Sequence, residues 1–320
     1  MTNFTEIPFS NITKFGQETM LDQNLFSVSW ILGRFCNYSC SYCWPYANSQ
    51  TPDYLELEIY KRTIDEIRFQ ASNNGFNKFH WSFSGGEPTA YKHALELMSK
   101  VLYDSIHMTT NLSPGINWWD RWLTTTELSR RRSLTASFHH EFANEQEFGD
   151  KIKYLTDNNV FVTINQVMVP EKFDELYNRC ARFSDRGINV TLKPQSDPTA
   201  SYMVDGYSDE MINKMRTGFP QHFNDSEVLQ VKLIDNENKV WYLDQAERFN
   251  SFGFNKFTGW KCNSGYQGIV IRSNEVKRSY SCHDKALGTL TDGFTIFNEP
   301  RVCTTPSCMS SADSKIPKCK

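Results

Sequence analysis

The chain has nine cysteines, and eight of them fall into two separate groups that constrain it more than any other feature of its sequence. Three of them, Cys36, Cys40 and Cys43, fall within eight residues, and five lie in the last 59 residues, beginning at Cys262. Cys180, between the groups, lies on the apolar side of a helix-like pattern and is expected to be a core thiol. An odd cysteine count in a long chain without a secretory signal does not fit a disulfide-stapled domain. Grouped thiols in a reducing compartment more often hold a metal, so we expect two metal sites in a cytoplasmic protein.

Charge and composition narrow the class of protein further. The chain has 34 basic and 37 acidic residues with both signs scattered, which argues against a basic nucleic-acid surface or a polybasic membrane arm. Aromatic residues make up 14% of the 320 residues, enough to build a sizeable core. An apolar run of about 18 residues is missing, and the N-terminus is neither basic nor followed by an apolar stretch. We therefore expect neither a transmembrane helix nor a signal peptide.

Strand-like and helix-like hydrophobic patterns alternate from residue 26 to residue 194. The predicted strands are Phe26–Leu32, Lys78–Phe83, Ser105–Thr110, Ser133–Phe138, Val160–Val167 and Ile188–Leu192. The predicted helices are about Tyr54–Ser72, Tyr91–Tyr103, Asn117–Arg130, Glu145–Asp157 and Glu171–Asp185. This alternation indicates an α/β domain with a parallel sheet, in which chemistry takes place at the carboxyl ends of the strands.

The remaining sequence suggests a division into four parts. These are an N-terminal arm over 1–25, the α/β core over 26–194, a bridging segment over 195–258 and a cysteine-rich domain over 259–320. The bridge is polar, with a short strand pair expected near Val228–Leu233 and Val240–Leu243. Within the core, Trp118, Trp119 and Trp122 are expected to form the buried side of their helix.

The first cysteine group has the spacing Cys36-x3-Cys40-x2-Cys43 and follows directly after the first predicted strand. Three thiolates on one short loop suit an iron–sulfur cluster, which takes soft ligands and, held by three of them, keeps one iron open. Zinc would need a fourth ligand nearby, and neither His80 nor Glu56 is spaced to supply it.

This loop resembles the CxxxCxxC motif of the radical S-adenosylmethionine (radical SAM) enzymes, including the aromatic Tyr42 before the last cysteine. About 40 residues further on, the run Ser84-Gly85-Gly86-Glu87-Pro88-Thr89 resembles the glycine-rich motif of the same family. The two motifs occur in register with the predicted strands. The resemblance implies a partial (β/α)6 TIM-like barrel.

The resemblance also implies cofactors and site residues. Cys36, Cys40 and Cys43 would be the catalytic cluster ligands, holding a 4Fe–4S cluster whose open iron binds S-adenosylmethionine. Further contacts to this cosubstrate would come from Tyr42, Ser84, Gly85, Gly86, Glu87, Thr110, Asn111, Ser137 and Asn165. His139 and Lys193 end strands at the same edge and are weaker candidates, whereas His140 is expected to be structural. One electron would cleave S-adenosylmethionine to a 5′-deoxyadenosyl radical that abstracts a substrate hydrogen, with reduced flavodoxin or ferredoxin as electron donor.

The C-terminal cysteines resemble the extension called SPASM, or its shorter relative called twitch. This resemblance implies a second, auxiliary 4Fe–4S cluster. Its ligands would be Cys262, Cys282, Cys303 and Cys308, with Cys319 as a spare or substitute. The Cys303-x4-Cys308 spacing is looser than the usual CxxC, and a structural zinc site with four thiolates or with His283 is the alternative.

The substrate is the open question at this level. Only 25 residues precede the first predicted strand, which is too few for the small recognition domain that many peptide maturases carry. We therefore expect oxidation or rearrangement of a small molecule, with the auxiliary cluster handling electrons. A peptide or protein maturase of SPASM type is the main alternative, a nucleotide- or nucleic-acid-modifying enzyme a lesser one, and a non-catalytic iron–sulfur protein the competitor from outside the enzymes. Methyl transfer and sulfur insertion also remain open.

Overall fold

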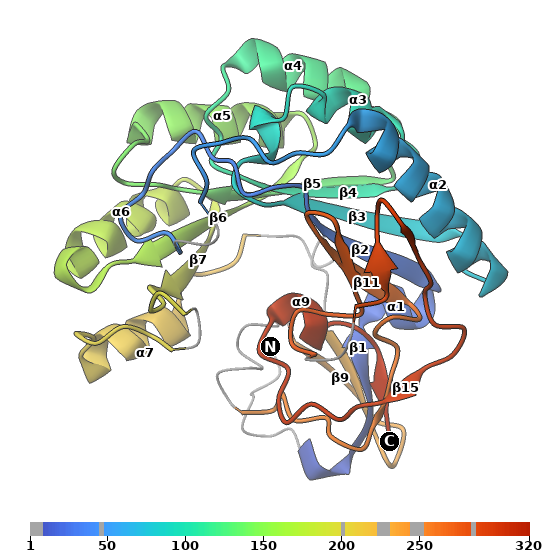
Figure 1. Ribbon diagram of the computed structural model, residues 1–320. Coiled ribbons are helices and arrows are strands. Elements are labelled where there is room, and N and C mark those ends of the chain that lie inside the picture. Colours follow the sequence, from blue (N-terminus) through green and yellow to red (C-terminus); the bar gives the residue numbers. More distant parts are fainter. Residues whose placement is uncertain (1–8, 45–47, 200–201, 223–230, 244–252, 283–285) are drawn as a thin grey trace. The chain divides into compact units, whose positions relative to one another are not determined.

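The computed structural model describes residues 9–44, 48–199, 202–222, 231–243, 253–282 and 286–320 (Figure 1). The chain forms two compact units. The first contains Met1–Trp30, Leu55–Trp81 and Val228–Lys320, and the second contains Ile31–Tyr54 and Ser82–Glu227. The N-terminal cysteine group thus belongs to the second unit, and the C-terminal cysteines belong to the first.

Four parallel strands form the sheet of the second unit. They are β4 (Ser105–Thr110), β5 (Arg131–Ser137), β6 (Phe161–Met168) and β7 (Asn189–Pro194), hydrogen-bonded in that order. The pairing is parallel, and Thr109 lies beside Thr135, which lies beside Thr163. Parallel strands in register bring their carboxyl ends to one edge, where Ser137 and Asn165 are neighbours.

Helices connect these strands and pack against the sheet (Figure 1). They are α3 (Ala94–Ser99), α4 (Ile116–Thr125), α5 (Glu145–Asp157) and α6 (Phe173–Asp185), with 3-10 turns η3 (Pro88–Ala90) and η4 (Pro170–Lys172). A further helix, α7 (Asp209–Thr217), follows β7. Alternate residues of the strands face the helices, so Leu134, Ala136 and Ile164 are buried. Phe138 packs edge to face on Phe148, with ring centroids 4.9 Å apart. One side of the sheet is therefore an aromatic-rich core.

The predicted elements of this unit differ from the structure mainly at their ends. β4 and α5 span the predicted residues, whereas the helix predicted over Tyr91–Tyr103 is reduced to α3. The turn η3 begins at Pro88 and occupies part of the connection. In α4, Trp119 and Trp122 are fully buried at helical spacing, while Trp118 is only half-buried. Cys180 is buried in α6, as expected for a core thiol.

The first unit holds the two strands that lead into the cysteine loop and the glycine turn. Its elements here are β2 (Leu25–Ile31), α2 (Leu57–Asn73), β3 (Lys78–Ser84), β11 (Gly268–Arg272), β12 (Glu275–Lys277), β13 (Gly288–Thr289) and β14 (Gly293–Phe294). The strand order is β14-β13-β12-β11-β2-β3. β2 and β3 run into the second unit at their carboxyl ends. The buried residues of β2 alternate, and Trp30 packs edge to face on Tyr60 of α2 at 5.5 Å.

A second sheet in the first unit joins both ends of the chain. It contains β1 (Ile12–Gln17), β8 (Val231–Asp235), β9 (Val240–Leu243), β10 (Lys261–Cys262), β15 (Arg301–Val302) and β16 (Lys318–Cys319), in the order β15-β10-β16-β1-β8-β9. The segment expected to be an N-terminal arm therefore contains β1, followed by α1 (Glu18–Asp22). Ile12 and Phe15 are fully buried in this sheet. The six residues of β1 include only two large apolar side chains, too few to form a hydrophobic pattern that predicts a strand.

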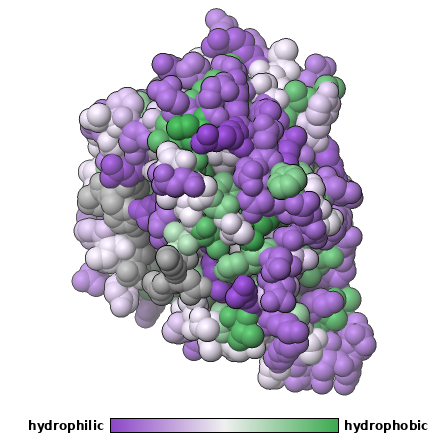
Figure 2. All heavy atoms as spheres, turned by 45° about the vertical axis from the view of Figure 1, so that its right-hand side comes forward, coloured by the Kyte–Doolittle hydropathy of each residue, from purple (hydrophilic) through white to green (hydrophobic). Residues whose placement is uncertain are grey.

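The face of the molecule shown in Figure 2 is mostly hydrophilic, with some exposed hydrophobic residues. Within the part of the chain that the structure describes, the helices are too short or too polar to cross a membrane.

An ion-pair group ties α5 to α6 and gives a pH-dependent prediction. The Glu145 carboxylate accepts hydrogen bonds from Arg182 at 2.7 Å and Arg179 at 3.2 Å. The hydrogen bond from Arg182 is the main cause that lowers the pKa of Glu145 below its usual 4.5. A lowered pKa stabilises the fold above the unfolded-state value, and this contribution is lost as the pH falls through the folded-state value.

We expect Glu145→Gln to lower the free energy of unfolding at pH 7 by about 1 kcal/mol, because the group is half-exposed and screened by solvent. The difference from the unsubstituted protein should shrink as the pH falls below 4.5, which urea titrations at several pH values would measure. A double-mutant cycle with Arg182→Gln isolates the pair. A pH-independent difference would contradict this explanation.

Candidate active site

The cysteine loop begins where β2 ends, and hydrogen bonds of its own backbone and to the Asp53 carboxylate hold it. Asp53 accepts hydrogen bonds from the backbone N–H of Arg34 at 2.7 Å and of Phe35 at 3.2 Å. The backbone N–H of Cys43 donates to the carbonyl of Cys40 at 3.1 Å, which closes a tight turn between two of the three thiols. The loop is thus preorganised by contacts near its two ends.

The three thiols lie close enough to influence one another. Burial is the largest cause that raises the pKa of each, and it raises that of Cys40 to about 12. The negative charge of Cys43 adds to the rise at both Cys36 and Cys40. Three neighbouring thiols that resist ionisation on their own fit a cationic iron–sulfur centre, because metal coordination deprotonates thiols outright. The donor set therefore fits the cluster that the loop motif implies.

The glycine turn after β3 lies directly against the backbone of the cysteine loop. The N–H of Gly86 donates to the Gly33 carbonyl at 2.9 Å, and the N–H of Glu87 donates to the Phe35 carbonyl at 2.8 Å. Gly85 has a φ of +143°, a conformation that favours glycine. A Cβ at Gly86 would lie 2.0 Å from the Phe35 carbonyl oxygen, so only glycine fits this position.

Glu87 is a buried carboxylate at the centre of a hydrogen-bond network. Its Oε1 accepts from the Thr89 backbone N–H at 3.0 Å, the Thr89 hydroxyl at 2.6 Å and the Thr110 hydroxyl at 2.8 Å. Its Oε2 accepts from the backbone N–H of Asn111 at 2.6 Å. Burial raises the pKa of Glu87, and these donors oppose the rise, with Asn111 the largest of them. Glu87 therefore joins the glycine turn to the end of β4.

The other predicted contact residues lie at the same edge of the sheet. Asn111 follows β4, and its side-chain amide donates to Asn37 of the cysteine loop at 2.9 Å. Ser137 ends β5 beside Asn165 of β6. Ser84 ends β3, and its carbonyl accepts from the backbone N–H of Leu32 at 3.0 Å. The strand ends thus hold the predicted residues together within the second unit. Their roles toward a cosubstrate remain predictions.

A conservative substitution tests whether Glu87 supports S-adenosylmethionine binding by fixing the glycine turn. Glu87→Gln replaces one acceptor oxygen by an NH2 group that faces the N–H of Asn111 or the donors at Thr89 and Thr110. We expect the free energy of unfolding to fall by about 2 kcal/mol, since buried donors lose their acceptor. We also expect S-adenosylmethionine binding to weaken more than cluster assembly does. Urea titration, calorimetric binding and iron analysis measure the three effects, with the exposed Glu96→Gln as control. Cluster loss with unchanged binding would contradict this assignment.

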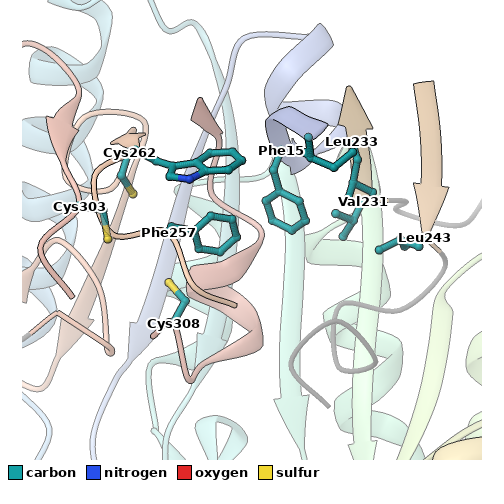
Figure 3. Close-up of a cluster of buried hydrophobic side chains, with 10 residues drawn as sticks. Phe15, Val231, Leu233, Leu243, Phe257, Cys262, Cys303 and Cys308 are labelled. Atoms are coloured by element: carbon teal, nitrogen blue, oxygen red, sulfur yellow. The ribbon is translucent and has the colours of Figure 1, made fainter. Parts of the chain in front are cut away.

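Four of the five C-terminal cysteines lie in the first unit with buried thiols. They are Cys262, Cys282, Cys303 and Cys308. Cys262, Cys303 and Cys308 belong to a core cluster with Phe257 and Phe15 (Figure 3). The charge of Cys282 raises the pKa of both Cys303 and Cys308, so it lies near them.

Cys319 lies apart from this group. In the antiparallel pair β10–β16, Cys262 is opposite Lys318, and Cys319 is opposite Lys261. Residues directly opposite share a face, and neighbouring residues in a strand point to opposite faces. Cys319 therefore points away from the face that carries Cys262. The structure gives Cys319 no place beside the four buried thiols.

The arrangement of these donors bears on the zinc alternative. Among the described residues, no three His, Cys, Asp or Glu side chains converge as the ligands of one metal ion do. His283, the other proposed zinc ligand, lies outside the described residues. The auxiliary cluster and the zinc site therefore both stay predictions.

Comparison with protein families agrees with this geometry. Residues 30–125 match the model of the radical SAM superfamily. Residues 30–125 are thus similar to a radical SAM domain. The matched segment contains the three-cysteine loop, the Gly85-Gly86 turn, Glu87 and Asn111. A domain of this superfamily implies an enzyme that uses S-adenosylmethionine and a 4Fe–4S cluster. A search of curated protein sequences found no match.

Solved structures share the fold of the chain at low sequence identity. SuiB from Streptococcus suis bound to S-adenosylmethionine is 14% identical, with a TM-score of 0.53, over 86% of this chain and 66% of that chain. SuiB bound to the precursor peptide SuiA is 16% identical, with a TM-score of 0.50, over 86% and 65%. Native anSMEcpe with bound AdoMet and Cp18Cys peptide is 16% identical, with a TM-score of 0.52, over 84% and 78%. The chain spans just under two thirds of the length of SuiB.

These comparisons confirm one expectation and correct another. The α/β fold, a parallel sheet resembling the partial barrel of radical SAM enzymes with a cysteine-rich C-terminal region, is confirmed. The preference for a small-molecule over a peptide substrate was wrong, because two similar structures hold peptides. That preference relied on the short N-terminal segment, whose residues the structure instead uses for β1 and α1.

Sequence reasoning also missed residues that contact the cysteine loop. Glu141 accepts hydrogen bonds from the backbone N–H of Ser41 at 2.8 Å and from its hydroxyl. Phe142 stacks on Tyr38 with ring centroids 4.9 Å apart. The only available signal was the position of this segment just after β5, at the edge where the chemistry of such sheets lies.

Proposed function

We propose that this chain is a radical SAM enzyme that modifies a peptide or protein substrate by hydrogen abstraction. The observation that carries the proposal is the second unit itself, where the cysteine loop, glycine turn and strand ends meet at one edge. Fold similarity to SuiB with its precursor peptide, and to anSMEcpe with AdoMet and a peptide, supports the substrate class. The small-molecule hypothesis is set aside.

The chain's own residues have distinct tasks in this proposal. Cys36, Cys40 and Cys43 would hold a 4Fe–4S cluster, which supplies the electron that cleaves S-adenosylmethionine to methionine and a 5′-deoxyadenosyl radical. Gly85 and Gly86 keep the backbone of the turn free of side chains, so a ligand can approach it closely. The buried network around Glu87 and Thr110 fixes that turn against β4. The sheet edge thereby orients the reactants and excludes water.

The four buried thiols of the first unit would hold an auxiliary 4Fe–4S cluster. Their soft donor set and the SPASM- or twitch-like order of the cysteines support this assignment. The substrate would lose one hydrogen atom to the 5′-deoxyadenosyl radical, one electron to this cluster and one proton to solvent, so that it loses two hydrogens overall. The reaction class we propose is therefore a two-electron oxidation of a peptide.

The auxiliary site gives a prediction in iron content. We expect Cys282→Ala to lower the iron from about eight to about four atoms per chain, since one 4Fe–4S cluster is lost. Cys319→Ala should keep about eight irons, because Cys319 points away from the other thiols. Iron and zinc analysis of anaerobically reconstituted protein measures both. An iron content that Cys282→Ala leaves unchanged, with zinc present in the unsubstituted protein, would show that the site holds zinc instead.

The proposed function is tested by S-adenosylmethionine cleavage in the reconstituted protein with dithionite. The probe is any short peptide encoded beside the gene, and Cys40→Ala is the inactive control. We expect 5′-deoxyadenosine to form together with a peptide product two hydrogens lighter, both seen by mass spectrometry. Cleavage that no peptide stimulates, with an unchanged peptide mass, would contradict the substrate class. Absence of cleavage would contradict the enzyme assignment.

A further inference from the structure

The segment that follows β5 contacts the cysteine loop residue by residue. We call His139–Phe142 the clamp segment. The Phe142 ring stacks on Tyr38 at 14° between ring planes. The Glu141 carboxylate accepts hydrogen bonds from both the backbone N–H and the hydroxyl of Ser41. These contacts join two segments about 100 residues apart and hold the loop in one conformation.

The remaining two residues of the clamp segment surround Tyr42. The His140 ring stacks on the Tyr42 ring with centroids 5.0 Å apart and 12° between planes. His139 Nδ1 lies 3.0 Å from the Tyr42 hydroxyl and 3.2 Å from the Cys40 sulfur. A hydrogen bond from the Tyr42 side chain is also the largest cause that lowers the pKa of Cys40, against the rise that burial produces. Two side-chain donors therefore meet at one thiol.

We propose that His139 and Tyr42 are positioning residues that donate hydrogen bonds to the Cys40 thiolate and raise the reduction potential of the cluster bound there. This inference rests on the proposed function, because it requires a cluster on the cysteine loop. Neither residue is assigned a role in bond breaking.

The chemistry of the ligand sets the direction of these bonds. A cluster-bound thiolate only accepts hydrogen bonds, so the imidazole N–H and the phenol O–H both point to sulfur. Cys36 differs, since its sulfur accepts from the backbone N–H of Tyr38 at 3.4 Å. Reduction adds negative charge to the cluster and its sulfurs, and each donor stabilises that charge. Loss of a donor should therefore make reduction harder.

A set of three variants separates hydrogen bonding from loop geometry. His139→Leu removes the donor, His139→Asn keeps an N–H near the position of Nδ1, and Phe142→Leu disturbs the loop without touching the thiol. The readout is the midpoint potential of the cluster, followed by electron paramagnetic resonance without S-adenosylmethionine. The signal of this cluster is the one that changes when S-adenosylmethionine is added afterwards. Iron per chain is measured for each variant.

We expect His139→Leu to lower the ratio of reduced to oxidised cluster about tenfold at a fixed solution potential. This change equals a decrease of 59 mV in the midpoint potential of the cluster for one electron. His139→Asn should recover most of that shift, and Phe142→Leu should leave the potential unchanged. If His139→Leu fails to assemble a cluster, Tyr42→Phe removes one O–H and should shift the potential in the same direction. An unchanged potential in fully loaded His139→Leu, or an equal shift in Phe142→Leu, would overturn the inference. Unsubstituted protein that loads no cluster on the loop would instead overturn the proposed function.

Discussion

Replacement of Cys40 by alanine is expected to reduce S-adenosylmethionine cleavage to the rate seen without enzyme. A cluster with an open iron depends on three protein thiolates, and Cys40 is the buried member of the three. Iron should fall from about eight to about four atoms per chain, because the auxiliary cysteines lie in the other unit. Quantified 5′-deoxyadenosine and iron analysis on the same samples measure both effects.

Cys180→Ala is the matched control for this experiment. Cys180 is also a buried thiol of the second unit, and burial raises its pKa to about 12, as for Cys40. Cys180 is one of the buried residues of α6. Its replacement by alanine should leave a small cavity and should not affect S-adenosylmethionine cleavage. Cleavage retained in Cys40→Ala, or lost in Cys180→Ala, would contradict the ligand assignment.

Gly86→Ala is the second substitution with a large expected effect. The added Cβ would lie 2.0 Å from the Phe35 carbonyl oxygen and 2.4 Å from that of Arg34, and both obstacles are backbone atoms. The glycine turn and the cysteine loop must then separate, which costs about 2 kcal/mol or more of stability as overpacking does. We expect the dissociation constant for S-adenosylmethionine to rise about tenfold or more, which corresponds to roughly 1.4 kcal/mol.

The matched control for this substitution is Gly115→Ala. A Cβ at Gly115 meets no atom within 4 Å, and its φ of −68° suits any residue. Isothermal calorimetry with the reconstituted protein measures binding, and thermal unfolding measures stability. Equal binding by Gly86→Ala and Gly115→Ala would show that the close approach of turn and loop has no part in ligand binding.

The sequence predicts the core of the second unit well because its signals are local. Buried and exposed residues alternate in the strands around Leu134 and Ile164, and the first three cysteines lie within eight residues. The partners of Glu87 could not be predicted, since Thr110 and Asn111 reach it only after β3 and β4 have paired in space. A carboxylate whose partners Thr110 and Asn111 lie 23 and 24 residues away leaves no periodic trace in the sequence.

Contacts between residues far apart in the sequence could not be predicted for the same reason. His139 contacts Cys40 across 99 residues, and neither residue's neighbours indicate the other. In the first unit, the burial of Phe15 depends on β8 and β16, which the chain supplies much later. The orientation of Cys319 follows from its pairing with Lys261, a detail that spacing between cysteines cannot show.

The position of β1 affects how the chain can fold during synthesis. Thr13 of β1 bonds to the carbonyl of Ile234 in β8, 221 residues further along, and Lys14 pairs with Cys319. At about 5–20 residues per second, a ribosome needs roughly 10–40 seconds to supply the β8 partner. During this time Ile12 and Phe15 have no sheet to enter and are available to chaperones. Cys262, Cys282, Cys303 and Cys308 are all synthesised after β8, so we expect iron delivery to the first unit to follow the pairing of β1 with β8.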